Sequence, residues 1–105
     1  MSASPSDDQA DAGTSGAVTR VMKICNEKGL HARASAKFVQ TVEKFDAKVT
    51  VSHKGDSAGG DSIMGLMMLG AGIGTSITVK ATGAQAADVV AALDELVAGK
   101  FGEEE

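Results

Sequence analysis

Two side chains at the start of a predicted helix have residue types suited to phosphoryl chemistry. His31 follows a turn at Gly29 and precedes Arg33 by two positions. A neutral imidazole can attack phosphorus near neutral pH, and a guanidinium pairs with the oxygens that arrive. The N–H groups that open a helix have no partners within it, so they favour a negatively charged group. The pair is therefore a candidate phosphoryl-acceptor site, although a histidine here also fits a plain helix cap beside a solvated arginine.

Ser62 is a second candidate, because it stands directly before an apolar run. A serine in this position typically caps the helix that follows and stabilises it by about 1 kcal/mol. A phosphate at a helix start is also well placed, and it would add about −1.5 to −2 of charge to the surrounding surface. The cap and a modification site are compatible, so the sequence leaves both interpretations open.

The short segment after this serine is apolar on almost every face. Two helical turns cannot bury all of those side chains against one sheet. We assign Leu66 and Leu69 to the core, and we expect Ile63, Met64 and Met67 to form an exposed patch. Methionine suits a docking surface because it is flexible and polarizable. A fully buried, methionine-rich segment is the alternative.

The other residues with reactive side chains are expected to be structural. His53 ends a predicted strand and is interpreted as a surface histidine. The single Cys25 excludes an internal disulfide and a cysteine-based zinc site. The glycines between residues 55 and 74 are not followed by the Gly-Lys-Ser/Thr of a phosphate-binding loop, and no metal-ligand spacing occurs. We therefore expect neither a metal nor a cofactor.

The spacing of apolar residues predicts the elements that position these groups. Alternation with a period of two predicts strands over residues 19–25, 47–53 and 75–81, with a short irregular strand within residues 54–61. Spacing of three and four predicts helices over residues 32–45, 62–69 and 86–99. The order is β-α-β-β-α-β-α, and a four-stranded sheet with three helices on one face would bury every apolar stripe. Because the connections are short, we expect mostly antiparallel pairing and an α+β fold.

Length and charge predict one small domain between two acidic ends. Residues 1–17 are interpreted as a disordered leader, residues 18–100 as the domain and residues 101–105 as an acidic tail. The formal net charge is −4, but six of the fourteen acidic residues lie in the two ends, which leaves eight against ten basic residues. A mildly basic domain with three Phe and no Trp or Tyr is a poor candidate for binding nucleic acid.

The sequence also lacks the features of membrane-spanning and secreted proteins. No apolar run is as long as the roughly 18 residues that a membrane span needs, and the N-terminus does not match a signal peptide. The use of a single cysteine fits a reducing cytosol. We expect a cytoplasmic monomer that does not bind a membrane.

Two motifs together resemble one protein family. The first is Gly29-Leu30-His31-Ala32-Arg33, which resembles the active-site signature of HPr, the histidine-containing phosphocarrier of the bacterial phosphoenolpyruvate-dependent phosphotransferase system. The second is Ser62-Ile63-Met64-Gly65-Leu66, which resembles the signature around the regulatory serine of that family. The resemblance runs from about residue 18 to residue 100 in matching element order. It implies an open-faced β-sandwich of a four-stranded antiparallel sheet and three helices.

The resemblance also implies a role for each candidate residue. His31 would take a phosphoryl group on Nδ1 from phospho-Enzyme I and pass it to an EIIA-type protein. Arg33 and the N–H groups that open the first helix would stabilise the charge of that group. Ser62 would be the site of an HPr kinase/phosphorylase. The docking surface would combine small residues of the first helix with exposed residues of the second, namely Ala32, Ala36, Ile63, Met64 and Met67.

Some positions depart from the family pattern. Many members have proline after the arginine, where this chain has Ala34, and lysine before the regulatory serine, where it has Asp61. Gln40 and Glu43 occupy helix positions that are often basic in sugar-transport members. These departures resemble the regulatory, nitrogen-related branch of the family. The alternative function is an HPr-like module that binds protein partners and seldom carries phosphate, and a small-molecule-binding regulatory domain is a third.

Overall fold

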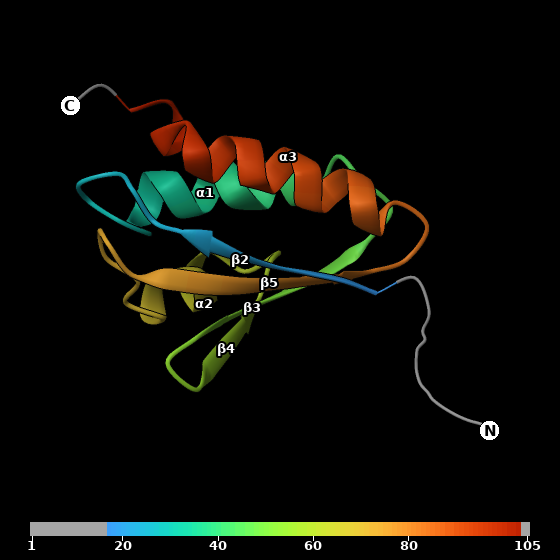
Figure 1. Ribbon diagram of the computed structural model, residues 1–105, viewed down its shortest axis with the longest axis horizontal. Coiled ribbons are helices and arrows are strands. Elements are labelled where there is room, and N and C mark those ends of the chain that lie inside the picture. Colours follow the sequence, from blue (N-terminus) through green and yellow to red (C-terminus); the bar gives the residue numbers. More distant parts are fainter. Residues whose placement is uncertain (1–16, 104–105) are drawn as a thin grey trace.

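The strands form one sheet in the computed structural model, which describes residues 17–103 (Figure 1). They are β2 (Val18–Lys23), β3 (Lys48–His53), β4 (Asp56–Gly59) and β5 (Ser76–Thr82). Their order across the sheet is β2-β5-β3-β4, and each neighbouring pair is antiparallel. The inner strand β5 places Val79 opposite Arg20 on β2 and opposite Val51 on β3. The predicted four-stranded antiparallel sheet is therefore confirmed.

Three α-helices complete the described part of the chain. They are α1 (Ala32–Val42), α2 (Ile63–Met68) and α3 (Ala86–Ala98), and a 3-10 turn, η1 (Lys100–Gly102), follows α3. α1 and α3 lie side by side over one face of the sheet (Figure 1). α2 packs against α1 and β4. This arrangement is the α+β, open-faced sandwich that the sequence predicts.

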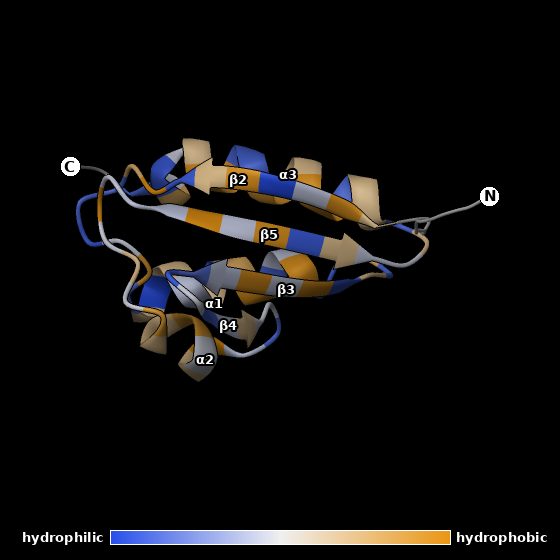
Figure 2. Cartoon of the chain, turned by 60° about the horizontal axis from the view of Figure 1, so that its bottom comes forward, coloured by the Kyte–Doolittle hydropathy of each residue, from blue (hydrophilic) through white to orange (hydrophobic). Residues whose placement is uncertain are grey.

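Alternation along the strands determines which side chains enter the core. Apolar and polar residues follow one another along the strands, as Figure 2 shows. The buried apolar residues of the strands are Met22, Val49, Val51, Ile77, Val79 and Ala81. The helices add Phe38, Leu66 and Leu93 to the same core, each fully buried. Burial of one such side chain stabilises the fold by about 1.5–3 kcal/mol. The shared core therefore holds the helices in place on the sheet, and with them the N-terminal ends of these helices.

One helix, α1, ends earlier than predicted at its C-terminal end. α1 stops at Val42 rather than at residue 45, because the N–H groups of Lys44 and Phe45 bond to carbonyls three residues back instead of four. α3 stops at Ala98, with Gly99 as its C-cap. No helix among residues 17–103 is long and apolar enough to cross a membrane.

Two predictions about single side chains have opposite outcomes. Leu66 and Leu69 are buried, as predicted. The prediction of His53 as a surface histidine is wrong, since its side chain is 6% exposed. His53 continues the inward register of Val51 on β3, and its Nδ1–H donates to the carbonyl of Ser76 at 3.0 Å. That carbonyl satisfies the buried donor, so the core accepts an imidazole there.

The packed chain continues past residue 100, where the sequence places the end of the domain. Phe101, assigned to an acidic tail, is fully buried, and Glu103 bonds to His31. The physical reason is the large apolar area of an aromatic ring, whose burial outweighs the polarity of the residues that follow it. The first sixteen residues of the predicted leader, and residues 104–105 of the predicted tail, lie outside the described part of the chain.

Candidate functional site

A tight turn delivers His31 to the start of α1. Gly29 has a φ of +62°, and a Cβ atom there would lie 2.3 Å from the carbonyl oxygen of Ala71. Only glycine fits this close approach, which a 3.0 Å hydrogen bond from the Leu30 N–H to the same carbonyl maintains. The backbone of His31 is extended, and its carbonyl accepts from the Ser35 N–H at 2.9 Å. His31 is therefore the N-cap residue of α1.

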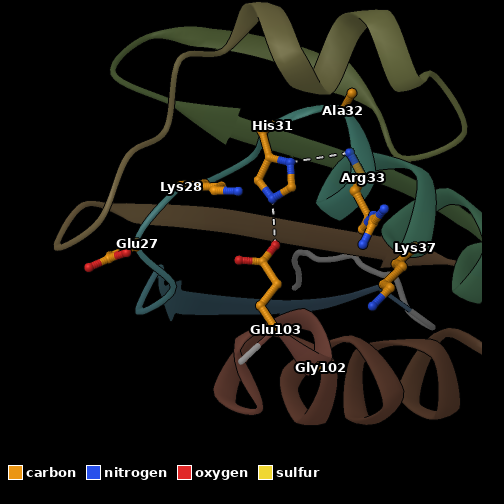
Figure 3. A pocket seen from close by; sticks show the side chains of 8 residues that line it. All are labelled: Glu27, Lys28, His31, Ala32, Arg33, Lys37, Gly102 and Glu103. Atoms are coloured by element: carbon orange, nitrogen blue, oxygen red, sulfur yellow. Dashed lines mark hydrogen bonds and ion pairs between the residues drawn. The ribbon is translucent and has the colours of Figure 1, made fainter. Parts of the chain in front are cut away.

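The Nδ1 atom of His31 faces the first N–H groups of α1. It accepts a hydrogen bond from the N–H of Arg33 at 3.3 Å, which is long and therefore weak (Figure 3). The side chain is 28% exposed, so a reacting group can reach the ring. The N–H groups of residues 32–34 have no carbonyl partner within the helix, and they favour an anion in the same place. The capping interpretation is thus confirmed, and the position also suits a phosphoryl acceptor.

The Nε2 atom of His31 is held by a carboxylate from the far end of the chain. Oε2 of Glu103 lies 2.5 Å from Nε2, and Oε1 accepts from Nδ2 of Asn26 at 3.1 Å. Because a carboxylate only accepts and Nδ1 already accepts from the backbone, Nε2 is the ring nitrogen that carries the proton. The hydrogen bond from His31 lowers the pKa of the Glu103 carboxyl, and partial burial opposes this shift. The lone pair of Nδ1 is left on the helix side of the ring.

An open hollow of about 670 Å³ lies beside this imidazole. Figure 3 shows that its walls come from the turn, from α1 and from the C-terminal residues. Lys28, Arg33 and Lys37 contribute three cationic groups, against the carboxylates of Glu27 and Glu103. These groups leave the walls with a positive excess of one charge, and a concave surface with a positive excess attracts anions. The hollow is therefore suited to an anionic group next to His31.

Sequence reasoning missed Glu103, because it assigned the last residues to an acidic tail. The contact joins residues 72 positions apart, and its carboxylate is one of three consecutive glutamates. The signal that could have found it is Phe101, an aromatic residue two positions earlier that needs a buried place.

Ser62 is the N-cap residue of α2. Its Oγ accepts from the Gly65 N–H at 3.0 Å, and its carbonyl accepts from the Leu66 N–H at 3.0 Å. A Cβ atom on Gly65 would come within 3.0 Å of Cβ of Ala58, so this glycine lets α2 approach β4. The capping prediction for Ser62 is confirmed, and the residue is half-buried.

The apolar residues predicted to be exposed on α2 are exposed. The fractions are 40% for Ile63, 68% for Met64 and 39% for Met67. Met68 at 80% and Ile73 at 56% belong to the exposed apolar set as well, although the sequence did not single them out. These five residues form what we call the α2 patch. The alternative of a fully buried, methionine-rich segment is wrong.

α2, which carries four of the five residues of the α2 patch, packs against α1. Ala32 is exposed and points toward α2, on the opposite side of His31 from Glu103 (Figure 3). Ala36, one turn further along α1, is half-buried. The tertiary structure therefore brings the helix that carries the exposed apolar residues against the helix that begins at His31.

The described residues offer no second chemical centre of an obvious kind. No three His, Cys, Asp or Glu side chains among residues 17–103 lie together as metal ligands would. The thiol of Cys25 is half-buried and donates to the carbonyl of Val97 at 3.2 Å.

Comparisons with known proteins extend over the same part of the chain. A family model described as the PTS HPr component phosphorylation site matches residues 18–99. Phosphocarrier protein HPr of Neisseria meningitidis is 48% identical over 84 residues, which cover 80% of this chain and 94% of that protein. Phosphocarrier protein NPr of Shewanella violacea is 39% identical over 84 residues, which cover 80% and 92%. A crystal structure of HPr-C-His from Thermoanaerobacter tengcongensis has a TM-score of 0.79 at 38% identity and covers 84% of this chain and 99% of that chain.

Proposed function

This chain belongs to the HPr family of phosphocarrier proteins, and we propose that Nδ1 of His31 is the atom on which it carries the phosphoryl group. The donor is phospho-Enzyme I of the phosphotransferase system, and the acceptor is an EIIA-type protein. One observation supports this choice of atom above the others: Nε2 is bonded to Glu103, whereas Nδ1 has, among residues 17–103, only the long bond from a backbone N–H. An imidazole attacks through a nitrogen lone pair, so the nitrogen that keeps its proton cannot be the nucleophile.

The transfer is a displacement at phosphorus. The Nδ1 lone pair forms the new N–P bond while the bond between phosphorus and the donor breaks, and the electron pair of that bond returns to the donor. The proton on Nε2 stays in place. In the second step a nucleophile of the acceptor forms its own bond to phosphorus, and the N–P electron pair returns to Nδ1. No other reactant is needed, so the chain acts as a carrier and does not turn over alone.

Backbone and side-chain donors stabilise the charge of the transferred group. Phosphoryl transfer depends mainly on positioning and on charge stabilisation. The 3.3 Å bond from the Arg33 N–H to Nδ1 is weak, so that N–H can turn to a phosphoryl oxygen at little cost. The guanidinium of Arg33 lines the same hollow and can pair with a second oxygen. We assign Arg33 this role of charge stabilisation.

The surface that meets the partners is the α2 patch together with the start of α1. Ala32, Ala36, Ile63, Met64 and Met67 supply it. An exposed apolar patch on the helix that packs against α1 supports docking, because several partners must reach the same nitrogen in turn and flexible methionine side chains can adapt to each.

Phosphorylation of Ser62 by an HPr kinase/phosphorylase is the regulatory part of the proposal. The hydroxyl stands at the edge of the α2 patch, directly before Ile63. A phosphate there would add about −1.5 to −2 of charge to an apolar docking surface and weaken it. Asp61 already places one negative charge beside the serine.

The location and the oligomeric state of the chain are also part of the proposal. We place the chain in the cytoplasm as a monomer, where the free thiol of Cys25 would persist. The chain departs from sugar-transport members at Ala34, Gln40 and Glu43, and these departures favour the nitrogen-related branch of the family. The protein that accepts the phosphoryl group would then be the EIIA-type protein of that branch. Competition between a sugar-transport EIIA and a nitrogen-related EIIA for the phosphorylated chain tests this assignment.

Phosphorylation with purified components tests the carrier function. The chain is incubated with Enzyme I and phosphoenolpyruvate, and intact mass is measured before and after mild acid. We expect a gain of one phosphoryl group that acid removes, and no gain for His31→Ala. The His31→Ala variant keeps His53, so it also reports whether the second histidine is modified.

Two outcomes would contradict the proposal. If the wild-type chain binds Enzyme I but is never modified, the module that acts by binding alone is the correct function. If His31→Ala is modified as fully as the wild type, the phosphoryl group is carried elsewhere.

A further inference from the structure

The last described residues form a turn that the backbone would not adopt without support. Lys100, Phe101 and Gly102 have φ angles of +58°, +57° and +74°. The left-handed region is disfavoured for the first two, which carry side chains. The buried ring of Phe101 and a 2.6 Å hydrogen bond from Nζ of Lys37 to the Phe101 carbonyl hold the turn in place.

The turn places the Glu103 carboxylate between two donors. Oε2 faces Nε2 of His31, and Oε1 accepts from Nδ2 of Asn26. The amide nitrogen of Asn26 also donates to the Gly29 carbonyl at 2.9 Å. Asn26 is fully buried, and its Oδ1 has no hydrogen-bond partner among the described residues. The amide is thus oriented to donate to the turn and to the carboxylate, even though its own oxygen is left unsatisfied.

We propose that Glu103 is a positioning residue of the phosphocarrier site, which keeps the proton on Nε2 and balances the positive charge that the ring gains when Nδ1 bonds to phosphorus. This inference rests on the carrier function proposed above. Attack by Nδ1 uses its lone pair while Nε2 keeps its proton, so the product ring is cationic. A carboxylate held at Nε2 stabilises that cation, and it therefore shifts the equilibrium toward the phosphorylated chain.

The charge of Glu103 stabilises the cationic ring from the Nε2 side, which is opposite to the nitrogen that bonds to phosphorus. Its carboxylate meets Nε2, while Nδ1 faces the start of α1. The phosphoryl group and the carboxylate are therefore separated by the width of the imidazole and do not compete for one position. The match to the family model ends at residue 99, so Glu103 lies outside the matched range.

Two variants separate the charge of Glu103 from its packing. Glu103→Gln keeps the size of the side chain and can still accept a hydrogen bond, but it removes the charge. Glu43→Gln is the matched control, because it makes the same charge change at the exposed C-cap of α1. Both variants are compared with the wild type in the full-length chain.

The first measurement is the ring spectrum of His31 without any partner. Proton–nitrogen NMR of the imidazole should give one downfield signal for a proton on Nε2 in the wild type. Glu103→Gln should move this signal upfield and speed its exchange with water, and Glu43→Gln should leave it unchanged. This readout does not depend on phosphorylation.

The second measurement is the equilibrium constant for transfer between phospho-Enzyme I and the chain. We expect Glu103→Gln to lower it about fivefold, a size typical of losing a partly exposed charged hydrogen bond, while Glu43→Gln stays within about 1.5-fold of the wild type. The inference is overturned if Glu103→Gln matches the wild type in both measurements, or if the equilibrium falls without any change at Nε2. If the wild-type chain is not phosphorylated at all, the carrier function fails, and the ring spectrum still decides the placement of the proton.

Discussion

Replacing Phe101 with alanine tests whether the C-terminal turn is part of the packed domain. The ring is fully buried, yet it lies only two residues from the end of the described chain. Truncating a buried Phe to Ala in an enclosed core costs about 3–5 kcal/mol. The turn from Gly99 to Glu103 can detach instead of leaving an empty cavity, so we expect a cost at or somewhat below the lower limit of that range. We expect the free energy of unfolding to fall by about 2–3 kcal/mol for Phe101→Ala.

Thermal unfolding followed by circular dichroism measures this loss. For a domain of this size, each kcal/mol lowers Tm by about 4–8 °C, so Tm should fall by about 10–20 °C. Phe45→Ala is the control, because its ring is half-buried against the edge of the same core. It should cost about 1 kcal/mol.

A second readout connects the turn to the site. Phe101→Ala should also release Glu103, so the Nε2 proton signal of His31 should change as it does in Glu103→Gln. The reasoning is refuted if Tm of Phe101→Ala stays within about 2 °C of the wild type, because a buried phenylalanine cannot be removed at so small a cost. It is also refuted if Phe45→Ala is the more damaging of the two.

Three further predictions follow from the site. Gly29→Ala should cost about 2 kcal/mol or more, because a Cβ atom would lie 2.3 Å from the Ala71 carbonyl oxygen and the backbone φ is positive. The control is Gly72→Ala, whose Cβ atom would have no described atom within 4 Å and which should be nearly neutral. Urea unfolding measures both. Ser62→Ala should lose about 1 kcal/mol with its cap, while Ser62→Asp can keep the cap and should lose affinity for Enzyme I; equal binding of Ser62→Asp and wild type in calorimetry would disprove the effect of charge. The hydrogen bond from His31 lowers the pKa of Glu103 in the folded state. The stability that this carboxylate adds is therefore present above its ordinary pKa of 4.5, and it is lost as pH falls through the lower folded value. The difference in unfolding free energy between wild type and Glu103→Gln should therefore shrink in acid, and a constant difference would contradict the assignment.

Most of the fold could be predicted because local patterns determine it. Alternation along β3 and β5 and the three-and-four spacing of α3 require each element to bury one face, and only a few layered arrangements bury them all. The ends of the elements were less predictable. α1 ended three residues early because two N–H groups took nearer carbonyls, a choice between hydrogen bonds of similar energy.

The errors share a physical cause. A polar side chain at the end of a strand with no partner nearby in sequence predicted an exposed His53. Its burial depends instead on a hydrogen bond to a carbonyl of β5, which is 23 residues away. Phe101 and Glu103 looked like part of a tail because charge dominates the composition of those last positions. In each case a contact distant in sequence supplied the partner that made burial favourable.

For the site itself, the sequence alone determined the position of His31 at a helix start, because a glycine turn, a capping residue and unpartnered N–H groups are all local features. It also predicted that Ser62 caps the second helix, but it left exposed and buried alternatives for the apolar residues that follow, and the structure shows them exposed. Only the tertiary structure shows that Nε2 of His31 is bonded to a carboxylate, whereas Nδ1 accepts from a backbone N–H. The carboxylate that accepts the hydrogen bond from Nε2 belongs to Glu103, 72 residues away in the sequence. It reaches the ring because Phe101 is buried and the chain turns back at that point.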